Sequence, residues 1–419
     1  MKPVRGLTVW WDGIEVGVLS TDSSGDTQFQ YLESWLQRGD ALPISHAMPL
    51  GDGAFTQREC RPFFDGLLPE EAQREAVAAA LGVSKGNYFR LLEALGGEVA
   101  GALTLWPLGE VPPTQDRAAM ASPLGEADLA RILERLPARP MLAGEGELRL
   151  SLAGAQSKLP VIKDENGIYL PMPGAPTTHI LKPPIPRFAH TTENEAFAMR
   201  LAAAVGLPVA PVEIGRAEKH VFLLVARYDR ERAPDGSLKR VHQEDFCQAL
   251  GCLTERKYAA EGGPSFRDCF QLLRDACTRP ARELLKLLDA AIFTLIVGNA
   301  DAHSKNYSLL YRAGETTMAP LYDLLSTVAY PELAPGLAMK IAKRSRLEDI
   351  RPDDWTLFAE ETGISEPYIR RRVRALSASV LNKADAVVGS FEIPQKSQMA
   401  MQGFADLIRG RAESLTLKV

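Results

Sequence analysis

The sequence predicts an α+β fold in which strand-rich regions come first and a mostly helical region follows. Residues 7–19 alternate between apolar and polar positions on both sides of an Asp-Gly pair, which is typical of a β-hairpin. Short strand patterns recur between residues 148 and 228. Beyond Asp245 apolar residues recur at helical spacing, most clearly from residue 284 to residue 296, so we expect a buried central helix there.

The first hundred residues are expected to form a compact α+β module. After the hairpin, residues 41–54 are rich in Pro and Gly and predict a loop. A helix is predicted at 70–81, because a proline and acidic residues open it and a glycine follows it. Ser84 is predicted to cap a second helix that ends at Leu95. The Pro-rich stretch 107–123 predicts a linker.

The middle of the chain alternates strands with two helices, and the last third is helical. Helices are predicted at 126–136 and 193–205. The predicted strands lie at 148–152, 159–162, 178–182 and 221–228. Further helices are predicted at 354–361, 366–381 and 404–415.

Composition excludes several classes of protein. The chain has 419 residues, 46% hydrophobic and 24% charged, which describes an ordinary globular protein. A net charge of −5 argues against a chain that binds nucleic acid along its whole length. The start lacks a signal-peptide pattern and no apolar run reaches transmembrane length, so we expect a cytoplasmic protein without a membrane segment. Five scattered cysteines without a C-x-x-C pair favour reduced thiols.

Three residues near the end of the predicted central helix suggest phosphoryl transfer. Asp301 is followed five positions later by Asn306, and Asp323 comes shortly after. A kinase catalytic loop needs one carboxylate at the attacking hydroxyl, and an amide oxygen with a second carboxylate to hold Mg²⁺ on the nucleotide phosphates. The Asp-x-x-x-x-Asn spacing matches that loop, although Asn299-Ala300 replaces the usual His-Arg pair.

A loop of small residues between two predicted strands is a candidate phosphate loop. Its members are Ala153, Gly154, Ala155, Gln156, Ser157 and Lys158. Small residues let backbone N–H groups approach phosphate oxygens, and Lys158 supplies positive charge. The sequence is neither a Walker A motif nor G-x-G-x-x-G, so a plain turn is the alternative.

Lys182 ends a predicted strand downstream of that loop. It suits a phosphate-bridging lysine oriented by a helix acid, for which Glu195 and Glu193 are both candidates. The alternative is a solvated surface lysine.

The segment from Gln243 to Phe246 follows the last predicted strand. Its backbone can offer hydrogen bonds to an adenine edge, with Phe246 against the ring, and its acids equally suit a helix N-terminus. In the candidate catalytic loop, His303 is expected to form structural hydrogen bonds, and Lys305 either meets the transferred phosphate or is exposed.

Two hydroxyls, Ser151 and Ser157, lie before and within the candidate phosphate loop. Either is a candidate phosphate acceptor, because about two added negative charges there would repel ATP and expel the loop. The alternative is a strand serine and a turn serine.

Two basic clusters are the candidates for a nucleic-acid surface. They are Lys340, Lys343, Arg344 and Arg346, and Arg370, Arg371, Arg372 and Arg374. Four basic residues in five helical positions cannot share one face, so we interpret both clusters as solvated surface.

Taken together, these stretches resemble the HipA family of serine/threonine kinase toxins. The matching stretches are SLAGAQSK (151–158), THILKP (178–183), NEAFAMRLA (194–202), QEDFCQALG (243–251), KYAAEGGP (257–264), GNADAHSKNYS (298–308), PLYDLLS (320–326) and FFDGLLPE (63–70). The resemblance covers nearly the whole chain and implies a two-lobed, protein-kinase-like fold with an N-terminal α+β subdomain. It implies an N-terminal subdomain at 1–106, a linker at 107–124, a small lobe with the phosphate loop at 125–245 and a helical large lobe at 246–419.

The resemblance also assigns roles to residues. It implies ATP and Mg²⁺ as cofactors, Asp301 as catalytic base, and Asn306 and Asp323 as metal ligands. The implied nucleotide-binding residues are 153–158, Lys182, Glu244, Asp245, Phe246, His303, Ser304, Lys305, Asn306, Tyr322 and Asp323. Ser151 matches the family's inhibitory autophosphorylation site, and Ser157, which stands where other members carry Glu, is a second candidate.

The resemblance further implies partners. Family members phosphorylate an aminoacyl-tRNA synthetase, typically glutamyl-tRNA synthetase, and are neutralised by a small helix-turn-helix antitoxin, HipB-like, that binds operator DNA. We therefore expect DNA contact mainly through that antitoxin. Two alternatives stay open: a kinase-shaped scaffold that serves as antitoxin partner and corepressor, and a kinase for lipid or small-molecule hydroxyls.

Overall fold

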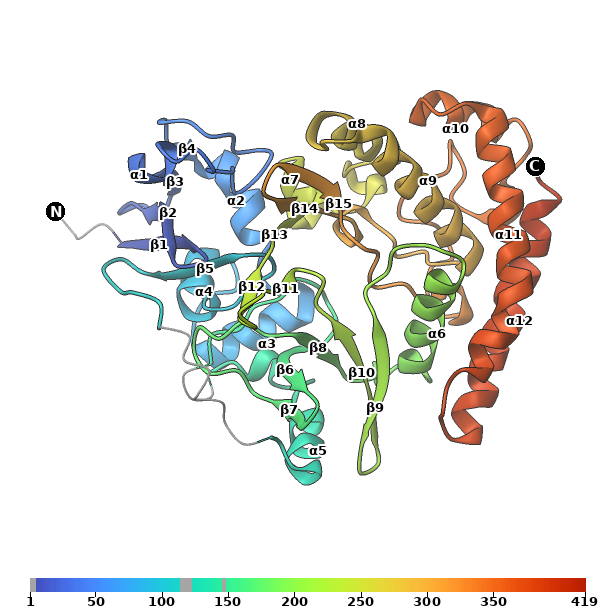
Figure 1. The fold of residues 1–419 in the computed structure, drawn as a ribbon, viewed down its shortest axis with the longest axis horizontal. Coiled ribbons are helices and arrows are strands. Elements are labelled where there is room, and N and C mark those ends of the chain that lie inside the picture. Colours follow the sequence, from blue (N-terminus) through green and yellow to red (C-terminus); the bar gives the residue numbers. More distant parts are fainter. Residues whose placement is uncertain (1–4, 114–122, 145–147) are drawn as a thin grey trace. The chain divides into compact units, whose positions relative to one another are not determined.

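The computed structural model describes residues 5–113, 123–144 and 148–419 (Figure 1). The chain divides into two compact units. Unit 1 comprises residues 1–183, 215–255 and 310–314, and unit 2 comprises residues 184–214, 256–309 and 315–419. The domain limits implied at residues 106, 124 and 245 stay a prediction.

Unit 1 begins with an antiparallel sheet of strand order β4-β3-β2-β1-β5. The strands are β1 (Arg5–Trp11), β2 (Ile14–Thr21), β3 (Thr27–Tyr31), β4 (Phe55–Thr56) and β5 (Leu103–Pro107). The predicted hairpin is confirmed as β1 and β2, with φ of 48° at Asp12 and 81° at Gly13. Positive φ at both central residues is what a type I′ turn requires.

Helices of unit 1 pack on this sheet. They are α1 (Glu33–Leu36), α2 (Gln57–Asp65), α3 (Glu71–Leu81) and α4 (Tyr88–Leu95). Phe63 and Leu92, from α2 and α4, are fully buried in the core with Phe29 of β3. The helix predicted at 70–81 is confirmed as α3. The cap predicted at Ser84 was wrong, because the Asn87 side chain accepts the N–H of Arg90 at 3.1 Å and α4 starts after it.

A second sheet, most of whose residues belong to unit 1, has the order β7-β6-β8-β10-β9. Its strands are β6 (Leu159–Asp164), β7 (Gly167–Tyr169), β8 (His179–Lys182), β9 (Val212–Ala217) and β10 (His220–Ala226). Helix α5 (Glu126–Arg135) buries Leu129 and Leu133 in the same core as Leu159 and Leu181 of the sheet. The strands predicted at 159–162, 178–182 and 221–228 and the helix predicted at 126–136 are confirmed.

The strand predicted at 148–152 was wrong. In this stretch only Leu150 forms a bridge, with Glu98. The backbone of Glu98 forms two hydrogen bonds with this stretch. Its N–H donates to the carbonyl oxygen of Arg149, and its carbonyl oxygen accepts the N–H of Ser151, each at 2.9 Å. The alternating sequence at 148–152 thus forms a single β-bridge, and the candidate phosphate loop follows it directly. The predicted linker at 107–123 lies mostly outside the described residues.

Unit 1 also contains β11 (Arg230–Arg232) and β12 (Leu238–Arg240), an antiparallel pair, then β13 (His242–Asp245) and α7 (Phe246–Ala249). Beside them lies a buried ionic cluster. Glu98 accepts hydrogen bonds from Arg227 Nη1 (3.1 Å), Arg230 Nη2 (2.7 Å) and Arg240 Nη2 (2.8 Å). Asp229 accepts from Arg227 Nη2 at 2.7 Å. Burial alone would raise the pKa of Glu98, but the three guanidinium groups, Arg230 foremost, hold it well below its usual range.

Unit 2 is mostly helical. Its helices are α6 (Thr191–Ala204), α8 (Phe266–Ala276), α9 (Pro280–Val297), α10 (Asp354–Thr362), α11 (Glu366–Gly389) and α12 (Gln395–Thr416). The long helices α11 and α12 lie side by side, and α11 also contacts α6, α9 and α10 (Figure 1). The helix predictions for this part of the chain are confirmed. Strands β14 (Ser308–Arg312) and β15 (Glu315–Met318) were not predicted.

No helix in the described part of the chain combines the length and the apolar character that crossing a membrane demands. The five cysteines are free thiols, four of them buried, as the sequence predicted.

Candidate active site

Helix α9 leads the chain into the candidate catalytic loop. Its apolar face, including Leu288, Ile292 and Leu295, is fully buried, and each such side chain contributes about 1.5–3 kcal/mol. The helix ends at Gly298 with a φ of 71°. A Cβ there would lie 2.3 Å from Val328 Cγ2, so this position requires glycine.

The backbone between that glycine and Asp301 is held on both sides. Ala300 N–H donates to Thr327 Oγ1 at 2.7 Å, and Thr327 Oγ1 donates to Gly298 O at 3.0 Å. Ala300 O accepts the N–H of Ala338 at 2.8 Å. Asp301 follows this fixed stretch and is exposed. The loop thus presents the carboxylate of Asp301 to solvent from a backbone that is held by hydrogen bonds.

The rest of the loop forms a 3-10 turn at Ser304–Asn306. Asn306 Oδ1 accepts the N–H of His303 at 3.1 Å. An amide oxygen has two lone pairs, so this bond leaves one for a metal ion. Lys305 is buried, which excludes the interpretation of it as an exposed lysine.

Two contacts tie the Tyr322-Asp323 segment to the catalytic loop. Tyr322 OH donates to Lys305 O at 2.8 Å. Asn299 Nδ2 donates to Asp323 O at 3.1 Å. Asp323 has a φ of 53°, a left-handed conformation that is uncommon outside glycine and that often marks functional sites. The three residues predicted from chemistry therefore lie on two segments that unit 2 fastens together.

The donor set fits Mg²⁺. Asn306 and Asp323 offer an amide oxygen and a carboxylate, which are the hard oxygen ligands that this ion prefers, and it normally takes few protein ligands beside phosphates and water. Among the described residues, no group of three or more His, Cys, Asp and Glu side chains could hold a metal ion.

In unit 1, the candidate phosphate loop rests on the start of α3. Gly154 has a φ of 113°, and its carbonyl accepts the N–H of Glu70 at 3.2 Å. Ser157 Oγ donates to Gln73 Oε1 at 3.1 Å. The Lys158 side chain turns toward the loop, and its Nζ donates a hydrogen bond to Ala153 O at 2.6 Å. The loop is therefore shaped by specific contacts and is more than a plain hairpin turn.

The Ser151 hydroxyl is fully buried and donates to Leu67 O at 2.8 Å. The alternative interpretation, a plain strand serine, does not describe it, because Ser151 lies outside the strands. Any transfer of phosphate to this oxygen requires residues 151–158 to leave their present position.

Lys182 ends β8 between β6 and β10 and is only 4% exposed. A lysine this deeply buried needs an anion or acceptors to compensate its charge, so the solvated interpretation is excluded. In unit 2, Glu193 accepts a hydrogen bond from Ser397 Oγ at 2.7 Å. Pairing of Lys182 with a helix acid stays a prediction.

The predicted adenine segment uses its side chains within unit 1. Glu244 accepts hydrogen bonds from Ser45 Oγ (2.6 Å) and His46 N–H (2.8 Å), and also from Tyr311 OH. Burial raises the pKa of Glu244 to about 7. Asp245 caps α7 by accepting the Gln248 N–H at 2.9 Å, as its acidic position suggested.

Phe246, next to this cap, is fully buried. An adenine ring laid against Phe246 therefore does not follow from the structure. Of the nucleotide contacts predicted for residues 244–246, those made by the backbone stay a prediction.

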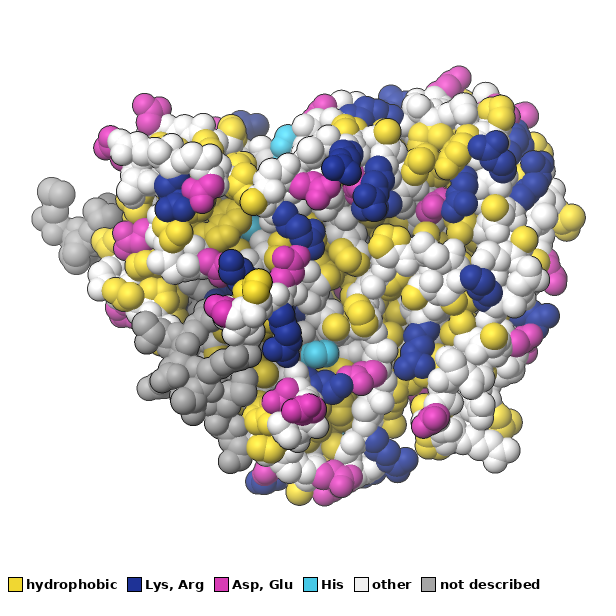
Figure 2. Space-filling view, viewed as in Figure 1, with side chains coloured by type: hydrophobic (Ala, Val, Ile, Leu, Met, Phe, Trp, Pro, Cys, Tyr) yellow, Lys and Arg dark blue, Asp and Glu magenta, His cyan; other side chains and the backbone are white. Residues whose placement is uncertain are grey.

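Three basic side chains of the predicted clusters have acidic partners in unit 2. Arg344, Arg370 and Arg372 pair with Asp354, Glu366 and Asp289 at 2.9, 2.7 and 2.7 Å. On the face drawn in Figure 2, Lys and Arg side chains are interspersed with Asp and Glu. This pairing favours the interpretation of both clusters as ordinary surface.

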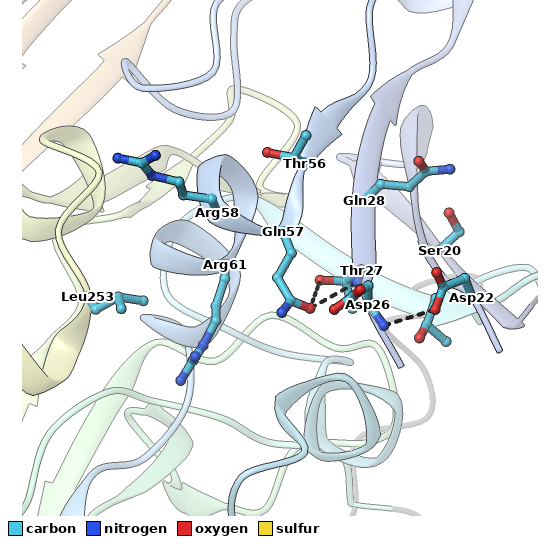
Figure 3. A pocket seen from close by; sticks show the side chains of 11 residues that line it. Ser20, Asp22, Asp26, Thr27, Gln28, Thr56, Gln57, Arg58, Arg61 and Leu253 are labelled. Atoms are coloured by element: carbon cyan, nitrogen blue, oxygen red, sulfur yellow. Dashed lines mark hydrogen bonds between the residues drawn. The ribbon is translucent and has the colours of Figure 1, made fainter. Parts of the chain in front are cut away.

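A separate pocket of about 630 Å³ lies in unit 1 among β2, β3 and α2. Asp22, Thr27, Gln57 and Arg61 line it, and Gln57 Oε1 accepts the Thr27 N–H at 3.0 Å (Figure 3). None of the predicted site residues lines this pocket.

The sequence interpretation missed two contacts with the site. Asn299 was noted only as a replacement of the usual histidine, and its position two residues before Asp301 was the available signal. Tyr258 donates a hydrogen bond to Asp301 Oδ1 at 2.8 Å, although 43 positions separate them. The KYAAEGGP stretch was the only hint of it.

Comparison with known proteins identifies the family of this chain. The HipA N-terminal domain family matches residues 7–106, and the HipA-like C-terminal domain family matches residues 150–385. Protein Y4mE of Sinorhizobium fredii is 54% identical over 420 residues, covering 99% of this chain and all of that protein. The serine/threonine-protein kinase toxin HipA of Shewanella oneidensis is 32% identical, covering 94% of this chain and 95% of that protein.

The solved complex of Shewanella oneidensis HipA, HipB and operator DNA contains a chain of the same fold. Its TM-score is 0.86 at 28% identity, and the match covers 97% of this chain and 96% of that chain. The α+β, two-lobed, protein-kinase-like fold predicted from the sequence is confirmed. This chain belongs to the HipA family of serine/threonine kinase toxins.

Proposed function

We propose that the chain is an ATP- and Mg²⁺-dependent serine/threonine protein kinase that acts as a toxin. The observation that carries the proposal is the exposed carboxylate of Asp301 on a braced loop, with Asn306 in that loop and Asp323 fastened to it through Asn299. These are the groups that phosphoryl transfer requires.

In this reaction Asp301 accepts the proton of a seryl hydroxyl. The hydroxyl oxygen bonds to the γ-phosphorus as the bond from that phosphorus to the β–γ bridging oxygen breaks, and ADP leaves. Asn306 and Asp323 would hold Mg²⁺, and the bound ion would neutralise charge on the phosphates. Lys182 and the backbone N–H groups of residues 153–158 bind the phosphates, and the backbone of 244–246 binds adenine. His303, Ser304, Lys305 and Tyr322 border the nucleotide.

The test is transfer from ATP. Purified chain is incubated with ATP and Mg²⁺, alone and with host lysate, and phosphorylated proteins are identified by mass spectrometry. We expect phosphate on a protein serine with wild type and none with Asp301→Ala. Because Asp301 is exposed, this variant should keep the wild-type melting temperature. Absence of transfer by a folded wild-type chain would favour the corepressor scaffold, and labelled lipid or metabolite alone would favour the small-molecule kinase.

The substrate that we propose is an aminoacyl-tRNA synthetase, with glutamyl-tRNA synthetase first. Its inhibition would stop translation and cause growth arrest or persistence. We propose that the reaction takes place in the cytoplasm, where translation occurs. The support is membership of a family in which the Shewanella relative is a serine/threonine kinase toxin. Purified glutamyl-tRNA synthetase, labelled by wild type and then assayed for aminoacylation, tests this choice.

Ser151 is the autophosphorylation site that we propose, with Ser157 as second candidate. Its hydroxyl is buried against Leu67, so a phosphate with about two negative charges cannot return to that position. Autophosphorylation would then hold the phosphate loop open and stop the enzyme. Phosphosite mapping of Ser151→Ala and Ser157→Ala separates the two sites.

We also propose a small DNA-binding antitoxin as partner, with operator DNA contacted mainly through it. The support is the Shewanella relative, which was solved with HipB and operator DNA. Co-purification of this chain with a co-expressed HipB-like protein, followed by an operator mobility shift, tests the partnership.

A further inference from the structure

Tyr258 reaches the carboxylate of Asp301 from a distant part of unit 2. Its hydroxyl donates a hydrogen bond to Asp301 Oδ1 at 2.8 Å. Tyr258 is half-buried, whereas Asp301 is exposed. The protein therefore supplies a donor to one oxygen of the carboxylate that we assign as the base.

The backbone of Tyr258 is fixed by a tight turn. Its carbonyl oxygen accepts the N–H groups of Glu261 and Gly263 at 2.9 and 3.0 Å. A Cβ at Gly263 would lie 2.0 Å from Arg256 O, so only glycine closes this turn.

The ring of Tyr258 is fixed by the catalytic loop. It packs edge-to-face against His303, with centroids 5.2 Å apart and an interplanar angle of 73°. Ser304 Oγ donates to the carbonyl of the preceding residue, Lys257, at 3.3 Å. Three positions of the loop, 301, 303 and 304, thus contact residues 257 and 258.

We propose that Tyr258 is a positioning residue that sets the orientation of the Asp301 carboxylate. This inference rests on the proposed kinase function. The terminal torsion of an aspartate is broad, so a hydrogen bond to one carboxylate oxygen narrows the range of orientations that the group adopts. The bond to Oδ1 restricts the plane of the carboxylate group that accepts the proton of the seryl hydroxyl. The same bond stabilises the ionised carboxylate, which is the form that accepts a proton.

The test is Tyr258→Phe, which removes the hydroxyl and keeps the ring against His303. We expect kcat to fall by about tenfold to a hundredfold, because small losses of alignment are costly in catalysis. KM for ATP should stay within twofold, and the acidic limb of the pH–rate profile should move to higher pH. Tyr368→Phe, at a half-buried tyrosine of α11, is the matched control. It should leave kcat, the KM for ATP and the pH–rate profile unchanged.

A second measurement does not depend on turnover. In protein labelled with ¹³C at aspartate carboxyls, the Asp301 signal is identified by its loss in Asp301→Asn. Its titration midpoint should rise in Tyr258→Phe, since a hydrogen bond to the charged form is lost. An unchanged midpoint together with unchanged kcat overturns the role of Tyr258. If wild type transfers no phosphate but the midpoint shifts, the kinase proposal fails while the positioning contact stands.

Discussion

Asn299 donates a hydrogen bond from Nδ2 to the main-chain oxygen of Asp323 at 3.1 Å. The amide that replaces the usual catalytic-loop histidine therefore fastens the candidate metal-binding segment to the candidate catalytic loop. Asn299 is 1% exposed, so this bond does not compete with water.

Replacing Asn299 by Leu should weaken the use of Mg²⁺ more than it weakens the fold. Loss of one neutral hydrogen bond costs about 1 kcal/mol, and Asp323 would lose part of what holds its left-handed backbone. We expect the Mg²⁺ concentration for half-maximal phosphate transfer to rise about threefold to tenfold. Ile408→Val in α12, which costs a similar free energy, is the control. Equal Mg²⁺ requirements in the two variants would refute this role.

Gln73→Ala should speed autophosphorylation. Gln73 accepts a hydrogen bond from Ser157 in the closed phosphate loop, and losing about 1 kcal/mol there shifts the loop about fivefold toward the open state. Phosphopeptide quantification over time measures the rate at Ser151. Glu75→Ala, on the same helix but paired with Lys85, should behave as wild type. A rate unchanged by Gln73→Ala would mean that this contact does not restrain the loop.

Glu244→Gln should stabilise the protein above pH 7 and change little near pH 4.5. The unfolded-state pKa is near 4.5 and burial raises the folded-state pKa to about 7, so the folded state binds more protons between these values. Stability therefore falls as pH rises through this window, by about 3 kcal/mol in total. Glutamine has no charge to bury and still accepts hydrogen bonds from Ser45 and His46.

Urea unfolding at pH 5 and pH 8 measures this difference. Glu360→Gln, at an exposed position of α10, should show the pH dependence of wild type. If the free energy of unfolding changed equally with pH in Glu244→Gln and in wild type, the Glu244 carboxyl would not be the source of the pH dependence.

Local signals in the sequence were enough for much of the fold. The Asp12-Gly13 turn and the glycines that end α3 and α9 act within a few residues, so the hairpin and both helix ends were predictable. Ser84 failed as a cap because Asn87 competed for the same role three residues later. The pattern at 148–152 failed because a strand needs a continuous neighbour, which no local pattern reveals.

Some residues of the candidate site were likewise predictable from local sequence, and others were not. Asp301, Asn306 and Asp323 were identifiable because a required spacing fixes their chemistry. Tyr258 and Gln73 act through partners that are distant in sequence, at Asp301 and Ser157, and only the folded chain brings them together. The burial of Lys182 and Phe246 likewise depends on packing around them.

Glu98→Gln should be strongly destabilising. It leaves Arg227, Arg230 and Arg240 buried with one fewer negative charge, and breaking a buried ionic cluster typically costs about 3–5 kcal/mol. A thermal melt at pH 7 should show a large drop for Glu98→Gln. Glu134→Gln, which breaks an exposed pair with Lys219, should melt within a degree or two of wild type. Equal melting temperatures would mean that water reaches the cluster.

The same cluster determines how the gene can be dissected. Glu98 belongs to the stretch matched by the N-terminal family and its arginine partners to the stretch matched by the C-terminal family, yet all lie in unit 1. A fragment that ends at residue 106 would contain Glu98 without its arginine partners. The remainder would contain the three arginines without Glu98. Chimaeras between relatives would need to take Glu98 and its three arginine partners from one parent, because the two stretches share one buried ionic cluster.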